Sequence, residues 1–226
     1  MGHASSSSSV EPSFEGDRNG SGRLTTKCGD VYEGVFNEGT IVKGKLFMAR
    51  GGVFEGVFEG GRMREGKLKC GGSGGGTYVG SFAGNNFHGD GTYTSANGSV
   101  LKGNFVNGVV HGNGSFSFKD GAEYTGRYSY GVKHGVGRYY YATGNTYEGE
   151  WSEGRQHGNG TFHHAVTGNF YEGQYSRGKR HGMGKFTFKE SSNVYEGAFE
   201  NDERHGAKGM LRYGNGDVYE VRTRPS

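Results

Sequence analysis

Six histidines recur along the chain at nearly equal intervals: His88, His111, His134, His157, His181 and His205. An imidazole nitrogen can bind a metal ion or accept a proton during catalysis. Two histidines that share a zinc ion place their nitrogens within about 4 Å of each other. If each repeat adds two strands about 4.8 Å apart, equivalent histidines lie roughly 10 Å apart. The spacing therefore favours histidines with local hydrogen bonds, and we predict neither a metal nor another cofactor.

A catalytic site would be expected as a local exception within such a pattern, because a nucleophile, its base and an orienting group act together. Almost every His, Glu and Tyr here occupies a repeated position. His163 and His164 fall outside the register, but adjacent strand residues point to opposite faces of a sheet. We therefore predict that the chain is not an enzyme.

The histidines belong to a repeat of 22 to 24 residues. Each repeat begins at a leader residue, and the leaders are Tyr32, Phe54, Tyr78, Leu101, Tyr124, Tyr147, Tyr171, Tyr195 and Tyr219. In all but the last repeat, a glycine follows two positions after the leader and an aromatic residue four positions after it. The histidine comes ten positions after the leader in the six middle repeats. Self-similarity of this length is typical of stacked structural repeats.

The alternation within each repeat predicts strands. In the segment 147–151, the leader, the glycine and Trp151 share one face, and two glutamates share the other. Asn107-Gly108, Glu153-Gly154 and Arg177-Gly178 divide the repeats into two strands; Asn97-Gly98, Asp120-Gly121, Thr143-Gly144 and Asn215-Gly216 separate successive repeats. Such pairs can take positive φ at both central residues of a tight turn. We predict an all-β fold, an elongated single-layer antiparallel ribbon of stacked β-hairpins.

Composition supports this prediction. Among the 226 residues are 48 glycines, 15 tyrosines and 15 phenylalanines, whereas leucine is scarce. The core must therefore be mostly aromatic, which favours strands. A net charge of +3 does not indicate nucleic-acid binding. Cys28 and Cys70 form no CxxC motif, and no run of about 18 apolar residues occurs, so we expect reduced thiols and no transmembrane helix.

The pattern Y-E-G-x-W-x-x-G-x-x-H-G-x-G-x-F resembles the MORN (membrane occupation and recognition nexus) repeat. The resemblance covers residues 14–221 as about nine repeats, of which the first and last are incomplete. The repeats that contain "GTIVKGKL" and "GRMREGKL" lack the histidine and are one residue short. We expect residues 1–13 to be a disordered polar tail and residues 222–226 to be a short tail.

The resemblance implies a scaffold or adaptor in a cytoskeletal, ciliary or membrane-associated assembly, located in the cytoplasm. Aromatic residues are favoured anchors at interfaces. We expect a groove with exposed aromatic side chains that binds a protein partner, such as a helical segment, or another copy of the chain. The candidate residues are Tyr124, Tyr128, Tyr147, Trp151, Tyr171, Tyr175, Tyr195 and Phe199.

The alternative function is binding of acidic phospholipids such as phosphoinositides. The cations before the histidines occupy closely equivalent positions, so we expect a basic stripe along one edge of the ribbon; they are Lys133, Arg155, Lys179, Arg180 and Arg204. Each cation near an anionic membrane contributes about 1 kcal/mol. An ordinary solvated edge explains the same residues, and we favour that explanation slightly. Gly2 also meets the minimal pattern for N-myristoylation, although a chance match within a serine-rich tail is easy.

Self-association through the C-terminal repeats is a further expectation. The segment "YGNGDVYEVR" begins another repeat and then stops, and Val221 stands where the pattern has glycine. Strand edges with unpaired backbone groups invite pairing with another chain. We therefore predict a two-fold dimer through this end of the array.

Overall fold

The strands follow one another as hairpins along the whole described part of the chain. The structure is a computed structural model that describes residues 10–72 and 75–221. It divides into an N-terminal unit, Met1–Val109, and a C-terminal unit, Val110–Ser226. No helix occurs among the described residues. The N-terminal strands are β1 (Ser13–Gly16), β2 (Ser21–Thr25), β3 (Val31–Asn37), β4 (Thr40–Phe47), β5 (Gly52–Glu59), β6 (Arg62–Cys70), β7 (Thr77–Ala83), β8 (Asn86–Thr94) and β9 (Val100–Val106).

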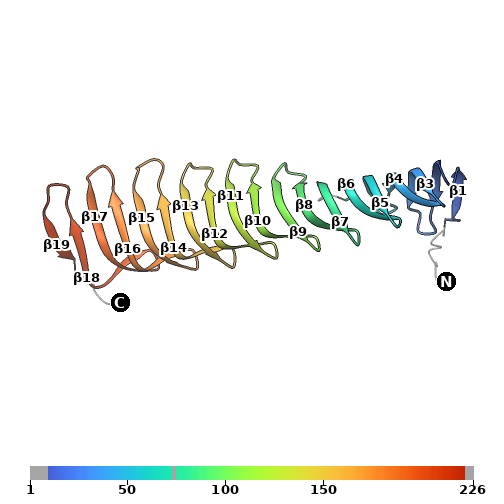
Figure 1. Cartoon of the computed structure of the whole chain (residues 1–226). Helices are drawn as coiled ribbons and strands as arrows, with labels where there is room; N and C mark the ends of the chain where they lie inside the picture. Colours follow the sequence, from blue (N-terminus) through green and yellow to red (C-terminus); the bar gives the residue numbers. More distant parts are fainter. Residues whose placement is uncertain (1–9, 73–74, 222–226) are drawn as a thin grey trace, which may run out of the picture. The chain divides into compact units, whose positions relative to one another are not determined.

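The remaining strands are β10 (Val109–Ser117), β11 (Glu123–Ser129), β12 (Val132–Tyr140), β13 (Thr146–Ser152), β14 (Arg155–His163), β15 (Phe170–Ser176), β16 (Lys179–Phe188), β17 (Asn193–Glu200), β18 (Glu203–Arg212) and β19 (Val218–Val221). Within each unit, every strand pairs antiparallel with the next strand in the sequence (Figure 1). The predicted all-β, single-layer antiparallel ribbon of hairpins is confirmed. Residues 1–9 and 222–226, which hold most of the two predicted tails and Gly2, lie outside the described residues.

A ladder of glycines runs across the paired strands. In the C-terminal unit, Gly149 pairs with Gly137 on one side and with Gly160 on the other. The leader ring lies over this bare backbone, because a Cβ built on Gly149 would be only 2.7 Å from the hydroxyl oxygen of Tyr147. Ordinary van der Waals contact for a Cβ begins at 3.4 Å. The alternation of glycine and aromatic residues thus creates space for a ring on the surface of its own strand.

The histidine–glycine pair marks a β-bulge. Glu150 pairs with His157, whereas the preceding Gly149 pairs with Gly160, so two residues of β14 have no opposite partner. One of them, Gly158, has φ of 56°, a conformation that favours glycine. The bulge in the repeats without histidine contains one residue, as the pairing between β3 and β4 shows. This difference explains why those repeats are one residue shorter.

The predicted tight turns are confirmed inside the repeats. Glu153 and Gly154 have φ of 52° and 77°, so both central residues are in the left-handed region. Between repeats the prediction is wrong: only the glycine of each pair Asn97-Gly98, Asp120-Gly121, Thr143-Gly144 and Asn215-Gly216 has positive φ. There the preceding side chain helps to close the loop, as when Asp120 Oδ1 accepts a hydrogen bond from the backbone N–H of Ala122 at 3.0 Å.

Candidate functional site

The eight candidate partner-binding aromatics form the spine of the core. Every one is at most 8% exposed; they are Tyr124, Tyr128, Tyr147, Trp151, Tyr171, Tyr175, Tyr195 and Phe199. Their rings meet edge to face both within a hairpin and between hairpins, for example Tyr147 with Trp151 at 5.2 Å and with Tyr175 at 5.1 Å between centroids. Such contacts add about 0.5–1.5 kcal/mol per pair beyond the burial itself. The expectation that these rings are exposed in a groove is wrong, because the glycine ladder lets them lie flat and cover one another.

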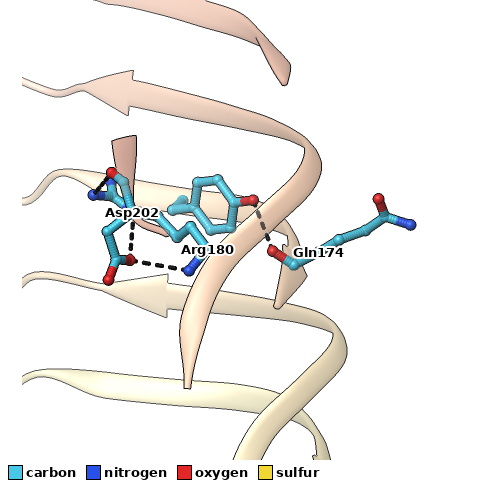
Figure 2. A network of polar contacts seen from close by, with 4 residues as sticks. Gln174, Arg180 and Asp202 are labelled. Carbon is cyan, nitrogen blue, oxygen red and sulfur yellow. Dashed lines mark hydrogen bonds and ion pairs between the residues drawn. The ribbon is translucent and has the colours of Figure 1, made fainter. Parts of the chain in front are cut away.

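The leader hydroxyls are also used within the fold. Tyr147 donates a hydrogen bond to the backbone oxygen of Glu150 at 2.9 Å, and Tyr171 donates to that of Gln174 at 3.0 Å (Figure 2). These oxygens lie at the bulges, where strand pairing is interrupted. Burial raises the pKa of the Tyr124 and Tyr171 hydroxyls to about 12 from an ordinary value of 10.0. These phenols are therefore neutral structural donors.

The residue nine positions after each leader, which we call the cover residue, packs over the rings. Along the chain the cover residues are Ile41, Met63, Phe87, Val110, Lys133, Gln156, Arg180 and Arg204. The first four are apolar, and Phe87 stacks on the Tyr78 ring at 3.9 Å. In the C-terminal unit the last four are polar or cationic. The cover position thus carries apolar side chains over the core in the earlier repeats and polar side chains over the aromatic rings in the later repeats.

Three of the five predicted lipid-binding cations are cover residues. The Lys133 nitrogen lies 4.3 Å from the Trp151 ring centroid, and the Arg180 and Arg204 guanidinium groups lie 5.4 Å and 4.5 Å from the Phe199 and Tyr195 centroids. The other two, Arg155 and Lys179, immediately precede cover residues and are exposed; Arg155 also lines a hollow together with Lys133, whereas Lys179 does not. The five cations therefore differ in their surroundings, and the basic stripe stays a prediction.

A groove follows the ring-covered face of the C-terminal unit. One hollow of about 460 Å³ has aromatic walls, which include Tyr141, Phe162, Tyr171 and Phe186. A second hollow of about 280 Å³ contains Lys133, Tyr139 and Trp151. Both hollows are lined by Tyr141, Gln156 and Gly178, and we call the combined feature the ring-face groove. Gln156 is held in place because its Nε2 donates to the Tyr141 hydroxyl at 3.0 Å.

One end of the ring-face groove is fixed by a polar clamp. Arg180 Nε bonds Asp202 Oδ1 at 3.2 Å, and Arg180 Nη2 donates to the Asp202 backbone oxygen at 2.7 Å (Figure 2). Asp202 lies in the turn of the next hairpin, and its backbone N–H donates to the Arg180 oxygen at 3.1 Å. The charge of Arg180 is therefore already compensated within the chain.

The six repeated histidines are not among the residues that line the ring-face groove, whereas His164 lines its larger hollow. His88, His134, His157 and His181 are exposed. His111 Nδ1 accepts a hydrogen bond from the Tyr130 backbone, and His205 Nδ1 lies 3.3 Å from a Glu200 carboxylate oxygen. Within residues 10–72 and 75–221, no three His, Cys, Asp or Glu side chains form a group that could hold a metal ion. In the same residues, no helix is long and apolar enough to cross a membrane.

Sequence reasoning missed the groove-lining residues Tyr139, Tyr141, Gln156, Phe162 and Phe186. A signal for them was present. A residue directly before the outward histidine must face the opposite side of the strand, where the rings lie. The cover residue changes from apolar to polar after Val110, and this change indicates which repeats contribute to the ring-face groove.

Solved structures include distant matches to this chain. The TCP10 domain of zebrafish (Danio rerio) CPAP, solved with a peptide of zebrafish STIL, is 10% identical; the match has a TM-score of 0.52 and covers 94% of this chain and all of that domain. The TCP10c domain of Drosophila melanogaster Sas-4 is 13% identical, with a TM-score of 0.32, and covers 60% of this chain and 93% of that one. At such identities the first match shows a shared fold only. No curated protein sequence matches the chain.

The MORN repeat model matches six consecutive segments, residues 78–100, 102–123, 124–146, 147–165, 171–192 and 195–218. Together they cover more than half of the chain. The segments coincide with the hairpins that carry the leader, the glycine ladder and the histidine–glycine bulge. The chain belongs to the MORN repeat family.

Proposed function

We propose that the chain is a non-enzymatic scaffold or adaptor that binds a protein partner in the ring-face groove of its C-terminal unit. The observation that carries this proposal is the groove itself, which combines an aromatic floor with polar groups that include Lys133, Arg155, Gln156 and the Arg180–Asp202 clamp. Concave, mostly apolar sites with a few fixed polar groups are typical of binding sites. The zebrafish CPAP domain, which shares the fold, was solved with a peptide, and this supports peptide binding by an open ribbon.

The partner contributes a segment of chain, such as a helix, whose side chains enter the two hollows. Membership of the MORN family supports a setting in the cytoplasm, in a cytoskeletal, ciliary or membrane-associated assembly. In that setting the protein would hold partners in place and perform no chemistry on them.

The variant Gln156→Phe tests the proposal. Phenylalanine fills the junction of the two hollows, and the ribbon accepts it because the equivalent cover residue in an earlier repeat is Phe87. The matched control is Val136→Phe, which adds the same ring at a position that is 63% exposed outside the groove. We expect affinity capture with the full chain to recover the same proteins with wild type and Val136→Phe, and to lose them with Gln156→Phe. Equal recovery by all three proteins would disprove the proposal.

Binding of acidic phospholipids is the second candidate function. It is supported by Arg155 and Lys179, which are exposed and form no ion pair among the described residues. If these cations bind anionic vesicles, replacing both with Glu will abolish sedimentation with vesicles, and high salt will weaken it in the wild type. If neither the substitutions nor high salt reduces vesicle binding, Arg155 and Lys179 are not responsible for it.

A dimer through the C-terminal repeats is a related proposal. In β19, Val218 and Tyr219 are 45% and 57% exposed, which places apolar surface on a short strand. Light scattering at tens of micromolar protein should give the mass of a dimer for the wild type and of a monomer for Tyr219→Glu. A monomeric wild type would rule the dimer out.

A further inference from the structure

Lys133 is the cover residue with the most unusual surroundings. Its nitrogen lies 4.3 Å, 4.7 Å and 5.4 Å from the ring centroids of Trp151, Tyr139 and Tyr124. An ammonium over ring faces is stabilised by cation–π attraction. The side chain is only partly exposed, and burial lowers the pKa of the ammonium below its ordinary value. The rings therefore stabilise a charge that has lost part of its hydration.

The same ammonium has no acceptor in the described part of the chain. Among residues 10–72 and 75–221, no carboxylate lies within 4.0 Å of it and no oxygen accepts its hydrogen bonds. An ammonium carries three donors, and a partly buried charge without a hydrogen-bonding partner is unfavourable. Arg180, at the other end of the ring-face groove, differs because Asp202 already compensates its charge. The groove is thus cationic at the Lys133 end and closed to further anions at the Arg180 end.

The hollow between these two ends has aromatic walls, and Asn145, His164, Thr167 and Asn169 also line it. Tyr141, Phe162 and Phe186 line it, and Gln156 separates it from Lys133. Its volume of about 460 Å³ can receive one or two large apolar side chains. A ligand that satisfies the whole groove therefore combines one negative charge with a neighbouring apolar group.

The geometry favours a peptide carboxylate over a lipid surface. The Lys133 nitrogen is recessed over rings in a hollow that Arg155 also lines, whereas Lys179 lies outside both hollows, so a flat anionic surface cannot engage Lys133 and Lys179 together. Arg155 is exposed, so Lys133 is the cation that a side chain inside the groove meets. The single ammonium of Lys133 suits a single carboxylate.

We propose that the ring-face groove binds an acidic segment of a protein partner, in which an Asp or Glu carboxylate pairs with Lys133 and an adjacent apolar side chain fills the hollow between Gln156 and Arg180. This inference rests on the proposed function, because it specifies the chemistry of the partner at the same groove. It also assigns Lys133 as the residue that determines specificity.

In the test, the full chain is used as bait to select binding peptides from a displayed library of random peptides. The affinity of each recovered peptide for the full chain is then measured. The decisive variant is Lys133→Met, which the ribbon accepts because Met63 occupies the equivalent position. The control is Lys179→Met, which removes the same charge outside the groove. The only tryptophan is Trp151, so its fluorescence reports on the pocket of Lys133 directly.

We expect the recovered peptides to carry Asp or Glu beside an apolar residue, and to change Trp151 fluorescence on binding. Lys133→Met should lower the affinity for these peptides about 10-fold or more, since a hydrogen bond to a charged group is lost. Replacing the acidic residue of the peptide, Asp→Asn or Glu→Gln, should lower the affinity by a similar factor. Lys179→Met should leave affinity unchanged. Some recovered peptides could lose binding to Gln156→Phe and yet lack acidic residues, or bind Lys133→Met as tightly as the wild type. Such peptides would overturn this inference and leave the proposed function intact.

Two other outcomes are decisive. If no recovered peptide is sensitive to Gln156→Phe, both the inference and the proposed function are wrong. If anionic vesicles bind the wild type but not Lys133→Met, and peptides do not bind, the groove recognises a membrane surface and the inference is overturned.

Discussion

Replacing Gly173 with alanine tests whether leader rings depend on the glycine ladder. Gly173 pairs with Gly184, and its backbone is not in the left-handed region. A Cβ on Gly173 would lie 2.5 Å from the Tyr171 hydroxyl oxygen and 2.6 Å from the Gly184 Cα. Because one obstacle is backbone and the other is a ring packed in the core, neither can move freely.

The expected loss of stability follows from two opposing effects. Overpacking of this kind costs about 1–3 kcal/mol, and a Gly→Ala change recovers about 0.4–1 kcal/mol by restricting the unfolded chain. We therefore expect Gly173→Ala to lower the free energy of unfolding by about 1–2 kcal/mol in urea titrations followed by circular dichroism. The control is Glu172→Ala on the opposite, exposed face of the same strand, with an expected change within about 0.5 kcal/mol. A Gly173→Ala protein as stable as the wild type would refute the account of the ladder.

Two further predictions concern the leader hydroxyls. Tyr147→Phe removes the donor to the Glu150 carbonyl at the bulge, and we expect a loss of about 1–2 kcal/mol in the same urea titration; no loss would show that this bond is not needed. Below pH 10 Tyr124 and Tyr171 are protonated in both the folded and the unfolded chain, but above pH 10 these two ionise readily only in the unfolded chain, because burial raises their pKa to about 12. Stability should therefore fall as the pH rises from 10 toward 12, and phenolate absorbance of these tyrosines should appear together with unfolding. Ionisation of all tyrosines near pH 10 without unfolding would contradict this.

The hairpin pattern was predictable because it depends on local rules. The alternation of Tyr147, Gly149 and Trp151 gave the strands and the shared face, and the turn Glu153-Gly154 gave the hairpin. The composition also predicted a mostly aromatic core, but the pattern did not show that the eight candidate partner-binding rings belong to it. The pairing of glycines with glycines on neighbouring strands shows how these rings lie flat and cover one another.

The groove was less accessible to prediction than the fold. The five cations before the histidines look equivalent in sequence, yet a shift of one position moves Lys179 to the opposite face from Arg180. The Arg180–Asp202 clamp joins residues 22 positions apart across a turn where most other repeats have glycine and one has Asn85. Such a contact depends on how successive hairpins stack, which no single repeat specifies.

The central claim is that the ring-face groove is where a protein partner binds. Site-specific photo-cross-linking tests it most directly, with a benzophenone amino acid placed in the full chain at Thr167, an exposed residue that lines the larger hollow, and at the exposed Val136 as the control. The probe at position 167 reaches molecules in the groove and leaves the junction at Gln156 unfilled. The account predicts a discrete protein adduct from position 167 that is absent from position 136. No adduct at position 167, or the same adducts from both positions, would contradict it.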